Sequence, residues 1–309
     1  MVRYILRRLV LFIPVALGIT IIVFVLIRFA PGDPIYTMLG LDYSKEAAEG
    51  LRHQLGLDRP IPVQYAFWVG RVLRGELGRS FFSREPVLAM ILRRLPTTVM
   101  LTITSMSVAL LISVPTGIIS ARWKDTIIDN VSRLVAILGV SIPVFWLGLM
   151  LLVVFGAYLR WFPIGGTVQE YGPKALVLPS IALGSGFTAL LTRMIRSNLI
   201  ETLGEDYIRT ARAKGLTDNK VYFHHALKNA LIPVITVVGL QFGTLLGGAV
   251  LTETIFNLPG LGRLLVDAIN ARDYPIIQGC VLTISFFFVV ANLVVDVMYG
   301  FIDPRIRYR

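Results

Sequence analysis

The chain alternates between six long apolar runs and shorter polar segments. Each run holds about 20 or more mostly apolar residues, the length that a helix needs to cross the hydrocarbon core of a bilayer. The runs are apolar on every face rather than at alternate positions, so they predict helices and not the strands of a membrane barrel. We therefore expect an all-α membrane protein with six transmembrane helices. The predicted spans are Leu9–Phe29, Thr97–Ser120, Leu134–Leu159, Ala175–Ile195, Ala230–Leu251 and Ile276–Ile302.

The stretch between the first two runs, residues 31–96, predicts an external amphipathic segment. Pro31-Gly32-Asp33-Pro34 ends the first helix, because proline cannot continue it. Capping and stop residues then predict three short helices, over 44–56, 62–75 and 83–95. Their apolar positions suit a collar on the outer membrane surface better than a separate functional domain.

The expected organisation is one transmembrane domain over residues 1–309. The first apolar run is too long for a removed signal peptide, and a poor cleavage site follows it. The expected parts are the N-terminus with the first span (1–30), the external segment (31–96), spans two to four (97–195), a cytoplasmic segment (196–230), and spans five and six with the C-terminal tail (231–309).

Basic residues gather at four places and give a net charge of +11, although only 16% of the residues are charged and 55% are hydrophobic. If six helices start from a cytoplasmic N-terminus, all four groups fall on the cytoplasmic side, as the positive-inside rule requires. We therefore predict that both termini are cytoplasmic, and that the charge sets the topology rather than binding nucleic acid. The groups are Arg3–Arg8, Arg122–Arg133, Arg193–Lys228 and Arg305–Arg309.

The sequence offers little of the chemistry of a metal site or an enzyme. One cysteine and three histidines are too few for the usual metal-ligand sets. Gly184-Ser185-Gly186 does not indicate a serine hydrolase, because no histidine lies in a predicted span to act as its base. The chain also has no Gly-Lys-Ser/Thr sequence and hence no phosphate-binding loop of an ATPase. We expect the glycines to permit close helix packing, together with four in the fifth run: Gly239, Gly243, Gly247 and Gly248.

Four polar residues near the ends of the predicted spans are candidates for the transport pathway or its gate. Asn292 and Asp296 lie four residues apart on one helix face. They contact either the pathway or a neighbouring helix, and the second alternative is favoured because Asp296 is close to the cytoplasmic boundary. Glu253 and Arg28 lie near the outer boundary. We expect them to reach toward water, where they either shape the external gate or pair with each other.

Residues 205–229 form a charged, helix-prone segment between two apolar runs. Tyr207, Ala211 and Gly215 recur at every fourth position, and the small residues on this face predict a surface that another protein can approach closely. Gly215 permits the left-handed backbone that ends a helix, and Thr217 can cap a second helix. The predicted result is a rigid elbow of two short helices that transmits a push to the fifth span. The other interpretation is a solvated basic loop that only sets topology.

Arg209-Thr210-Ala211, three further residues and Gly215 resemble the EAA-x3-G cytoplasmic loop of ABC importer permeases, in the form used by dipeptide and oligopeptide permeases. Arg209 stands where the general pattern has an acidic residue, and Thr210 replaces its first alanine; both departures suit the peptide branch. The long outer segment resembles that of the first of two permease subunits. Similarity to the family in order and spacing extends over essentially the whole chain, through residues 28–34, 93–98, 251–262 and 303–307.

The resemblance implies a type I ABC importer permease in a prokaryotic inner membrane. This chain and a second homologous permease subunit would form the pathway. Two cytoplasmic ATPase subunits or domains would bind ATP and Mg, and an external substrate-binding protein would deliver the cargo. The chain itself would bind no cofactor. The residues implied in ATPase coupling are Tyr207, Arg209, Thr210, Ala211, Arg212, Ala213, Lys214, Gly215 and Leu216.

The implied cargo is a dipeptide or an oligopeptide. The same family also transports nickel complexes and some oligosaccharides, and these remain alternatives. From a different class, an ATP-independent channel or secondary transporter would share the long apolar helices and the missing ATPase loop. Dependence on a bound ATPase distinguishes the two classes.

Overall fold

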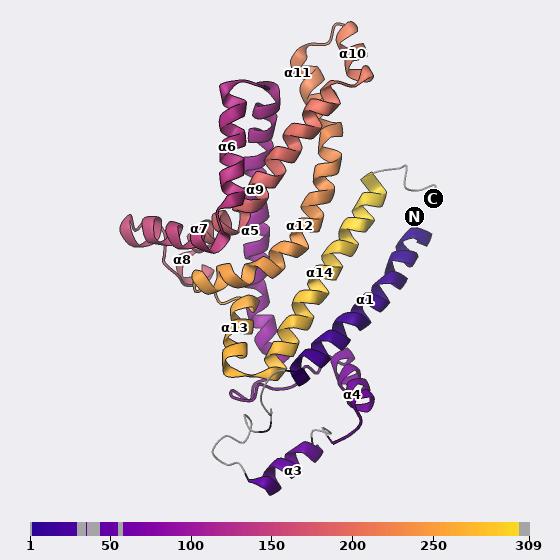
Figure 1. The fold of residues 1–309 in the computed structure, drawn as a ribbon, viewed down its shortest axis with the longest axis vertical. Coiled ribbons are helices and arrows are strands. Elements are labelled where there is room, and N and C mark those ends of the chain that lie inside the picture. The colour runs from indigo at the N-terminus through magenta and orange to yellow at the C-terminus, as the bar shows by residue number, and fades with distance from the viewer. Residues whose placement is uncertain (1, 30–34, 36–43, 55–57, 303–309) are drawn as a thin grey trace. The chain divides into compact units, whose positions relative to one another are not determined.

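The computed structural model describes residues 2–29, 35, 44–54 and 58–302, and all the named elements among them are helices (Figure 1). The chain divides into two compact units, Met1–Thr98 with Pro259–Val290, and Val99–Leu258 with Ala291–Arg309. The helices are α1 (Val2–Phe29), α3 (Lys45–Gln54), α4 (Ile61–Leu73), α5 (Val87–Arg122), α6 (Ile127–Ser141), α7 (Val144–Leu151) with the π-helical η2 (Leu152–Tyr158), α8 (Val168–Tyr171), α9 (Lys174–Leu203), α10 (Asp206–Ala213), α11 (Asp218–Lys220) with the π-helical η3 (Val221–Ala226), α12 (Leu227–Ile255), α13 (Leu261–Ala271) and α14 (Tyr274–Ile302).

Four helices in the described part of the chain are long and apolar enough to cross a membrane, and a fifth span is formed if α6 and α7 count as one. The four lie in Val87–Arg122, Lys174–Leu203, Asp218–Ile255 and Tyr274–Val294. They agree with four of the expected spans. Within α1, the expected first span, Val10–Val25 is an apolar helix, and the side chains of the residues on either side of it lie outside the described ones.

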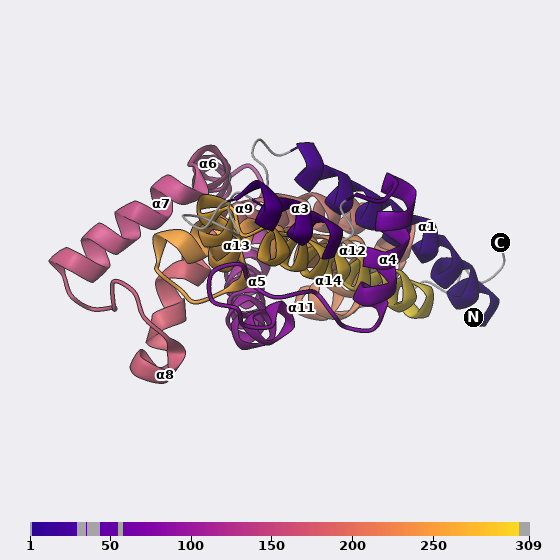
Figure 2. The ribbon, with the colours of Figure 1, turned by 90° about the horizontal axis from the view of Figure 1, so that it is seen from below.

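The expected single helix over 134–159 is in fact two helices that meet at an angle of 99°. Pro143 precedes the first residue of α7 and has a ψ of 133°, which lies outside the helical region. Ile142 is also extended, as is usual for a residue before proline. Figure 2 shows α6 nearly end-on while α7 runs away from it. Pro143 therefore breaks the helix, whereas Pro179 and Pro233 lie inside α9 and α12.

In the first unit, α4 packs on α1 through aromatic residues. The hydroxyl of Tyr65 on α4 lies 2.7 Å from that of Thr20 on α1, and Phe24 contacts the rings of both Tyr65 and Trp68. The third short helix expected over 83–95 is the first part of α5 and continues into the second span. A separate cluster joins α5, α13 and α14, and its buried members are Val87, Ile91, Leu261, Leu264, Ala268, Ile276 and Cys280.

In the second unit, α9 packs against α6, α7 and α12. Gly184 on α9 permits the closest approach, because a Cβ atom there would lie 2.7 Å from the carbonyl oxygen of Ser105 on α5. The expected packing role is thereby confirmed for Gly184. A Cβ atom on Gly247 of α12 would meet nothing within 4 Å, and one on Gly248 would make an ordinary contact at 3.5 Å. Neither position requires a glycine for close packing.

We expect Gly184→Ala to lower the free energy of unfolding by about 1–3 kcal/mol, the usual cost of overpacking a well-packed core. Gly186→Ala is the matched control, because Gly186 lies on the same helix and its Cβ atom would meet nothing within 4 Å. There the gain in helix propensity should leave stability equal or higher. Denaturant titration of the detergent-solubilised protein measures both variants. Equal stabilities would contradict a tight contact at Gly184.

Candidate functional site

The most distinctive candidate site is the charged elbow between α9 and α12. Its first helix, α10, begins with the acidic Asp206, whose carboxylate suits the positive end of the helix. The helix ends at Ala213, and Gly215, two residues later, has a φ of +77°, in the left-handed region that glycine adopts without strain. This confirms the helix stop expected from the sequence. Thr217 also stands at the expected cap position of α11, although its side chain makes no capping hydrogen bond.

The inner face of α10 is buried, and it holds the elbow to the body of the second unit. Ile208 is fully buried, and Ala211 is 8% exposed. We expected Ala211 on a surface open to a partner, but it lies in the intramolecular contact, where a small side chain lets α10 approach closely. Leu216 packs against the same cluster. We call this cluster the elbow core, and its buried members are Ala121, Leu199, Ile208, Ala211, Val221, Tyr222, Ala226 and Ala230.

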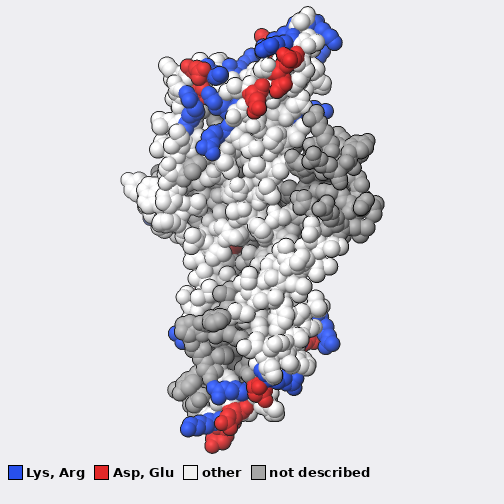
Figure 3. Space-filling model, turned by 45° about the vertical axis from the view of Figure 1, so that its right-hand side comes forward, with Lys and Arg blue, Asp and Glu red and all other residues white. Residues whose placement is uncertain are grey.

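The outer face of α10 is exposed and carries three cations, of which Arg209 pairs with Asp206 and Arg212 with Asp218. Tyr207 is 41% exposed, and Figure 3 shows the charged side chains gathered over the end of the second unit that carries α10 and α11. A surface of several cations on a short rigid helix suits a partner that offers acidic or hydrogen-bond-accepting groups. The other exposed residues of the expected coupling set are Arg209, Thr210, Arg212, Ala213, Lys214 and Gly215.

Polar contacts connect the two arms of the elbow. The side-chain amide of Asn229 donates to the hydroxyl of Tyr207 at 2.9 Å, and this bond ties α10 to the start of α12. The guanidinium of Arg122, at the end of α5, donates to Asn219 at 3.2 Å and lies 5.8 Å from the centre of the Tyr222 ring. These contacts and the elbow core connect the elbow to α5, α9 and α12.

Sequence reasoning missed a buried ion pair that joins α5, α6 and α9. The carboxylate of Asp129 is fully buried and receives two hydrogen bonds of 2.6 Å from the guanidinium of Arg196. The hydroxyl of Ser120 donates to it at 2.6 Å, and the backbone N–H of Asp125 donates at 2.9 Å. Arg133 lies farther away, at 3.8 Å. We call Asp129, Arg196 and Ser120 the α6 clamp.

The α6 clamp could have been suspected from the sequence. An acid at the start of one apolar run and a cation near the end of another are costly in a membrane unless they pair. Asp129 in a first helical turn nevertheless also fits a favourable helix dipole, and Arg196 fits the positive-inside pattern. Each residue thus had a sufficient local explanation, which concealed the pair.

Two of the four candidate pathway residues, Glu253 and Asn292, have side chains that the structure describes. Glu253 is fully buried in the second unit, so the expectation that it reaches toward water is wrong. Asn292 is half-buried on α14. The side chains of Asp296 and Arg28 lie outside the described residues, so their expected contacts stay predictions.

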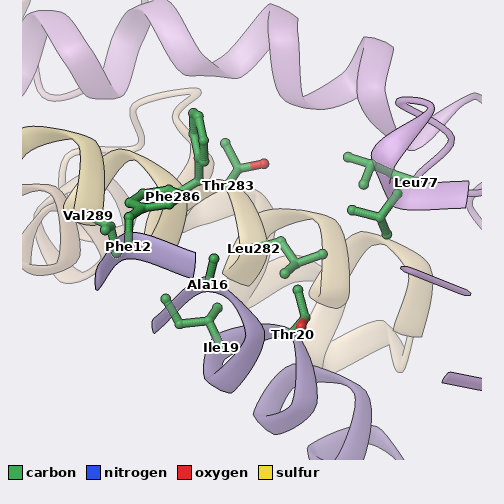
Figure 4. A pocket seen from close by; sticks show the side chains of 10 residues that line it. Phe12, Ala16, Ile19, Thr20, Leu77, Leu282, Thr283, Phe286 and Val289 are labelled. Carbon is green, nitrogen blue, oxygen red and sulfur yellow. The ribbon is translucent and has the colours of Figure 1, made fainter. Parts of the chain in front are cut away.

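An apolar groove of about 240 Å³ lies in the first unit, where side chains of α1 face those of α14 (Figure 4). Among the described residues that line it, Thr20 and Thr283 are the two that carry polar side-chain groups. The Thr283 hydroxyl is already bonded to the carbonyl of Gly279, and that of Thr20 to the carbonyl of Leu17. A peptide with charged termini would find no charged partner on this lining, so the groove is a poor candidate for a peptide site.

Comparison with known proteins gives concordant matches along the chain. The model of the family described as binding-protein-dependent transport system inner membrane component matches residues 113–308, and the model of its N-terminal region matches residues 1–102. The dipeptide transport system permease protein DppB of Alkalihalophilus pseudofirmus is 44% identical, with all of both chains covered. The glutathione transport system permease protein GsiC is 44% identical in Salmonella choleraesuis and 42% identical in Escherichia coli K12, again over the full length of both chains.

Solved structures support the same architecture. A chain of the MetNI methionine ABC transporter in an inward-facing conformation superposes with a TM-score of 0.56 and 17% sequence identity. The match covers 71% of this chain and 99% of that chain. A chain of an amino acid ABC transporter crystallised with histidines gives a TM-score of 0.52 at 15% identity. At these identities the likeness concerns the fold.

Proposed function

The chain belongs to the family of binding-protein-dependent transport system inner membrane components, and from this premise we propose that it is a permease subunit of an ATP-driven importer of dipeptides or oligopeptides. The observation that carries the proposal is the full-length identity of 44% with a dipeptide permease and with a glutathione permease. Both relatives are named for small peptides. Peptide cargo is therefore better supported than a nickel complex or an oligosaccharide, and family membership argues against an ATP-independent channel or secondary transporter.

The proposed topology has six spans with both termini in the cytoplasm of a prokaryotic cell, in its inner membrane. It counts α1 as the first span and α6 with α7 as the third. The 28 residues of α1 correspond to about 42 Å of helix, which exceeds a hydrocarbon core of about 30 Å. This arrangement places the four basic groups on the cytoplasmic side, and the positive-inside rule supports it.

The proposed assembly has a second homologous permease subunit beside this chain, two cytoplasmic ATPase subunits or domains, and an external substrate-binding protein. ATP and Mg would be bound by the ATPases, and this chain would contribute half of the pathway. In the proposed division of the chain, residues 196–230 are the coupling segment, and residues 31–96 are external up to the first turns of α5.

In this assembly the outer face of α10 sits on the ATPase. Arg209, Arg212 and Lys214 contact it, while Ile208 and Ala211 hold the elbow to the elbow core. Closure of the ATPases on ATP displaces α10. Because the elbow core and the Tyr207–Asn229 hydrogen bond connect α10 to long helices, the displacement moves those helices and changes access to the pathway.

The proposal predicts that the full chain, purified in mild detergent from its native membrane, retains a second permease and ATP-hydrolysing subunits. Charge reversal of Arg209 and Lys214 to glutamate should remove the ATPase from the eluate, because it replaces two exposed cations of α10 with anions. Mass spectrometry identifies the retained subunits, and an ATPase assay measures the activity.

The matched control reverses Arg160 and Lys174 to glutamate, with the same change in net charge. Both residues are exposed, and they lie outside the elbow. This variant should retain the ATPase. A wild-type preparation without any ATPase, under conditions that preserve known complexes, would overturn the proposed function. Loss of the ATPase from both variants would leave α10 without a specific role.

A further inference from the structure

We propose that the outer face of α4 is an interfacial site for anionic phospholipid headgroups. The inference goes beyond the transport function. The proposed topology decides only which leaflet α4 contacts. With a cytoplasmic N-terminus, it is the outer leaflet. The observation behind it is a short amphipathic helix that is held at the end of α1 and presents exposed apolar and basic residues together.

The contacts with α1 place α4 at the edge of the hydrocarbon core. Phe24 of α1 contacts Trp68 of α4, with ring centres 5.6 Å apart. Phe24 lies five residues before Phe29, the last residue of α1, which is about 7 Å along the helix axis. If the 28-residue helix is centred in the bilayer, Phe24 lies about 13 Å from the midplane, close to the boundary at about 15 Å. Tyr65 and Trp68 then occupy the depth at which amphipathic aromatic side chains are enriched.

The opposite face of α4 is unoccupied among the described residues and combines two kinds of side chain. On this face Phe67 is 60% exposed, and Val63, one turn earlier on the same stripe, is 39% exposed. Arg71 and Arg74 lie on the stripe that contains Phe67, one and two helical turns further along. An open cleft of about 330 Å³ lies along this stripe, and the described residues that line it are Ala66, Phe67, Gly70, Arg71 and Arg74.

The charge on this face suits an anionic partner. No acidic residue occurs between Arg59 and Gly75. The guanidinium of Arg59 lies 4.8 Å from the centre of the Phe67 ring, so a third cation adjoins the apolar stripe. Arginine binds phosphate through two parallel N–H donors. Val63 and Phe67 can enter the acyl boundary, while the arginines reach outward along their aliphatic stems to the headgroups.

The length of α4 excludes a spanning role. Its 13 residues correspond to about 20 Å of helix, too short for a core of about 30 Å. A helix of this kind, with basic and apolar residues side by side, lies in the plane of the interface. We infer that α4 anchors the external segment to the lipid surface and that phosphatidylglycerol is preferred over a zwitterionic lipid.

The test reports lipid contact directly and needs no transport partner. Phe67→Trp is introduced into the full chain after its four native tryptophans are changed to phenylalanine. The protein is reconstituted in vesicles of phosphatidylcholine that contain either brominated phosphatidylglycerol or brominated phosphatidylcholine at the same mole fraction. We expect stronger quenching by brominated phosphatidylglycerol than by brominated phosphatidylcholine. Each arginine near an anionic surface should enrich phosphatidylglycerol around the introduced tryptophan on the order of fivefold. Bromine atoms near the headgroup should quench more than bromine atoms deep in the chains.

Arg71→Gln with Arg74→Gln should remove the preference for phosphatidylglycerol. Arg79→Gln with Arg84→Gln is the matched control, because both residues are exposed arginines of the same unit in the neighbouring turn. It should keep the preference. Equal quenching by the two lipids in the parent protein would overturn the proposal, as would an equal loss in both variants. If the first variant kept the lipid preference but lost retention of the external binding protein, the face would belong to a protein partner instead.

Discussion

Replacing Gly215 with valine is expected to uncouple ATP hydrolysis from transport while the chain still inserts into the membrane. Gly215 has a φ of +77°, and a β-branched side chain in this region carries strain of about 1–3 kcal/mol. A Cβ atom at this position would meet nothing within 4 Å, so the strain comes from the backbone and not from a clash. The elbow relieves it by reorienting α10 relative to α11. We expect the rate of substrate transport to fall about tenfold or more, while ATP hydrolysis continues.

Gly172→Val separates loss of coupling from backbone strain alone. Gly172 has a φ of +64°, its Cβ atom would also meet nothing within 4 Å, and it lies outside the elbow. The control should carry at least as much strain, because the φ of +64° and ψ of −155° at Gly172 lie in a region that is essentially restricted to glycine, and it should keep the ratio of transported substrate to hydrolysed ATP. The measurement is that ratio in proteoliposomes that contain the assembled transporter and its binding protein. Normal substrate-stimulated turnover in the Gly215 variant would defeat the proposed coupling role.

Removing the carboxylate of the α6 clamp is expected to have the largest effect on stability. In Asp129→Ala, the guanidinium of Arg196, which is only 18% exposed, loses its partner inside the second unit. Leaving one charge of a buried pair without compensation typically costs about 3–5 kcal/mol. The hydroxyl of Ser120 and the backbone N–H of Asp125 also lose their acceptor. Denaturant titration in detergent should therefore show a large fall in the free energy of unfolding.

Two further variants test whether the cost arises from the unpaired charge. Asp129→Leu combined with Arg196→Met should recover most of the lost stability, because apolar replacement of a whole buried pair is often neutral. Asp206→Ala removes the exposed partner of Arg209 and should cost less than about 1 kcal/mol. If Asp129→Ala lowered the free energy of unfolding no more than Asp206→Ala does, the α6 clamp would not stabilise the fold as its geometry indicates.

The elbow was the part of the candidate site that the sequence predicted best. Charge between apolar runs, a glycine at a helix end and an acid in the first turn are local signals, and the structure has them where expected. Which face of α10 turns toward the protein interior was not predictable in the same way. Ala211 fits a partner-facing surface and an internal contact equally well, and only the packing of α10 against η3 and the rest of the elbow core assigns it to the inside.

The sequence by itself determined the class of protein, the approximate position of the four clearest long helices and the place of the charged elbow. These properties follow from the hydrophobicity of successive residues and from local backbone preferences, which act over one helix or less. The membership in a permease family likewise rests on the order of residues along the whole chain.

Only the tertiary structure decided which distant residues meet. Asp129 and Arg196 are 67 positions apart, and Gly184 approaches Ser105 from a different helix. The break at Pro143 was likewise undecided, because proline is tolerated in spans such as those of α9 and α12 when neighbouring groups satisfy the freed backbone. The burial of Glu253 also depends on its neighbours. In each case the stability of the observed arrangement depends on groups of other elements that surround the residue. A single sequence does not reveal which groups these are.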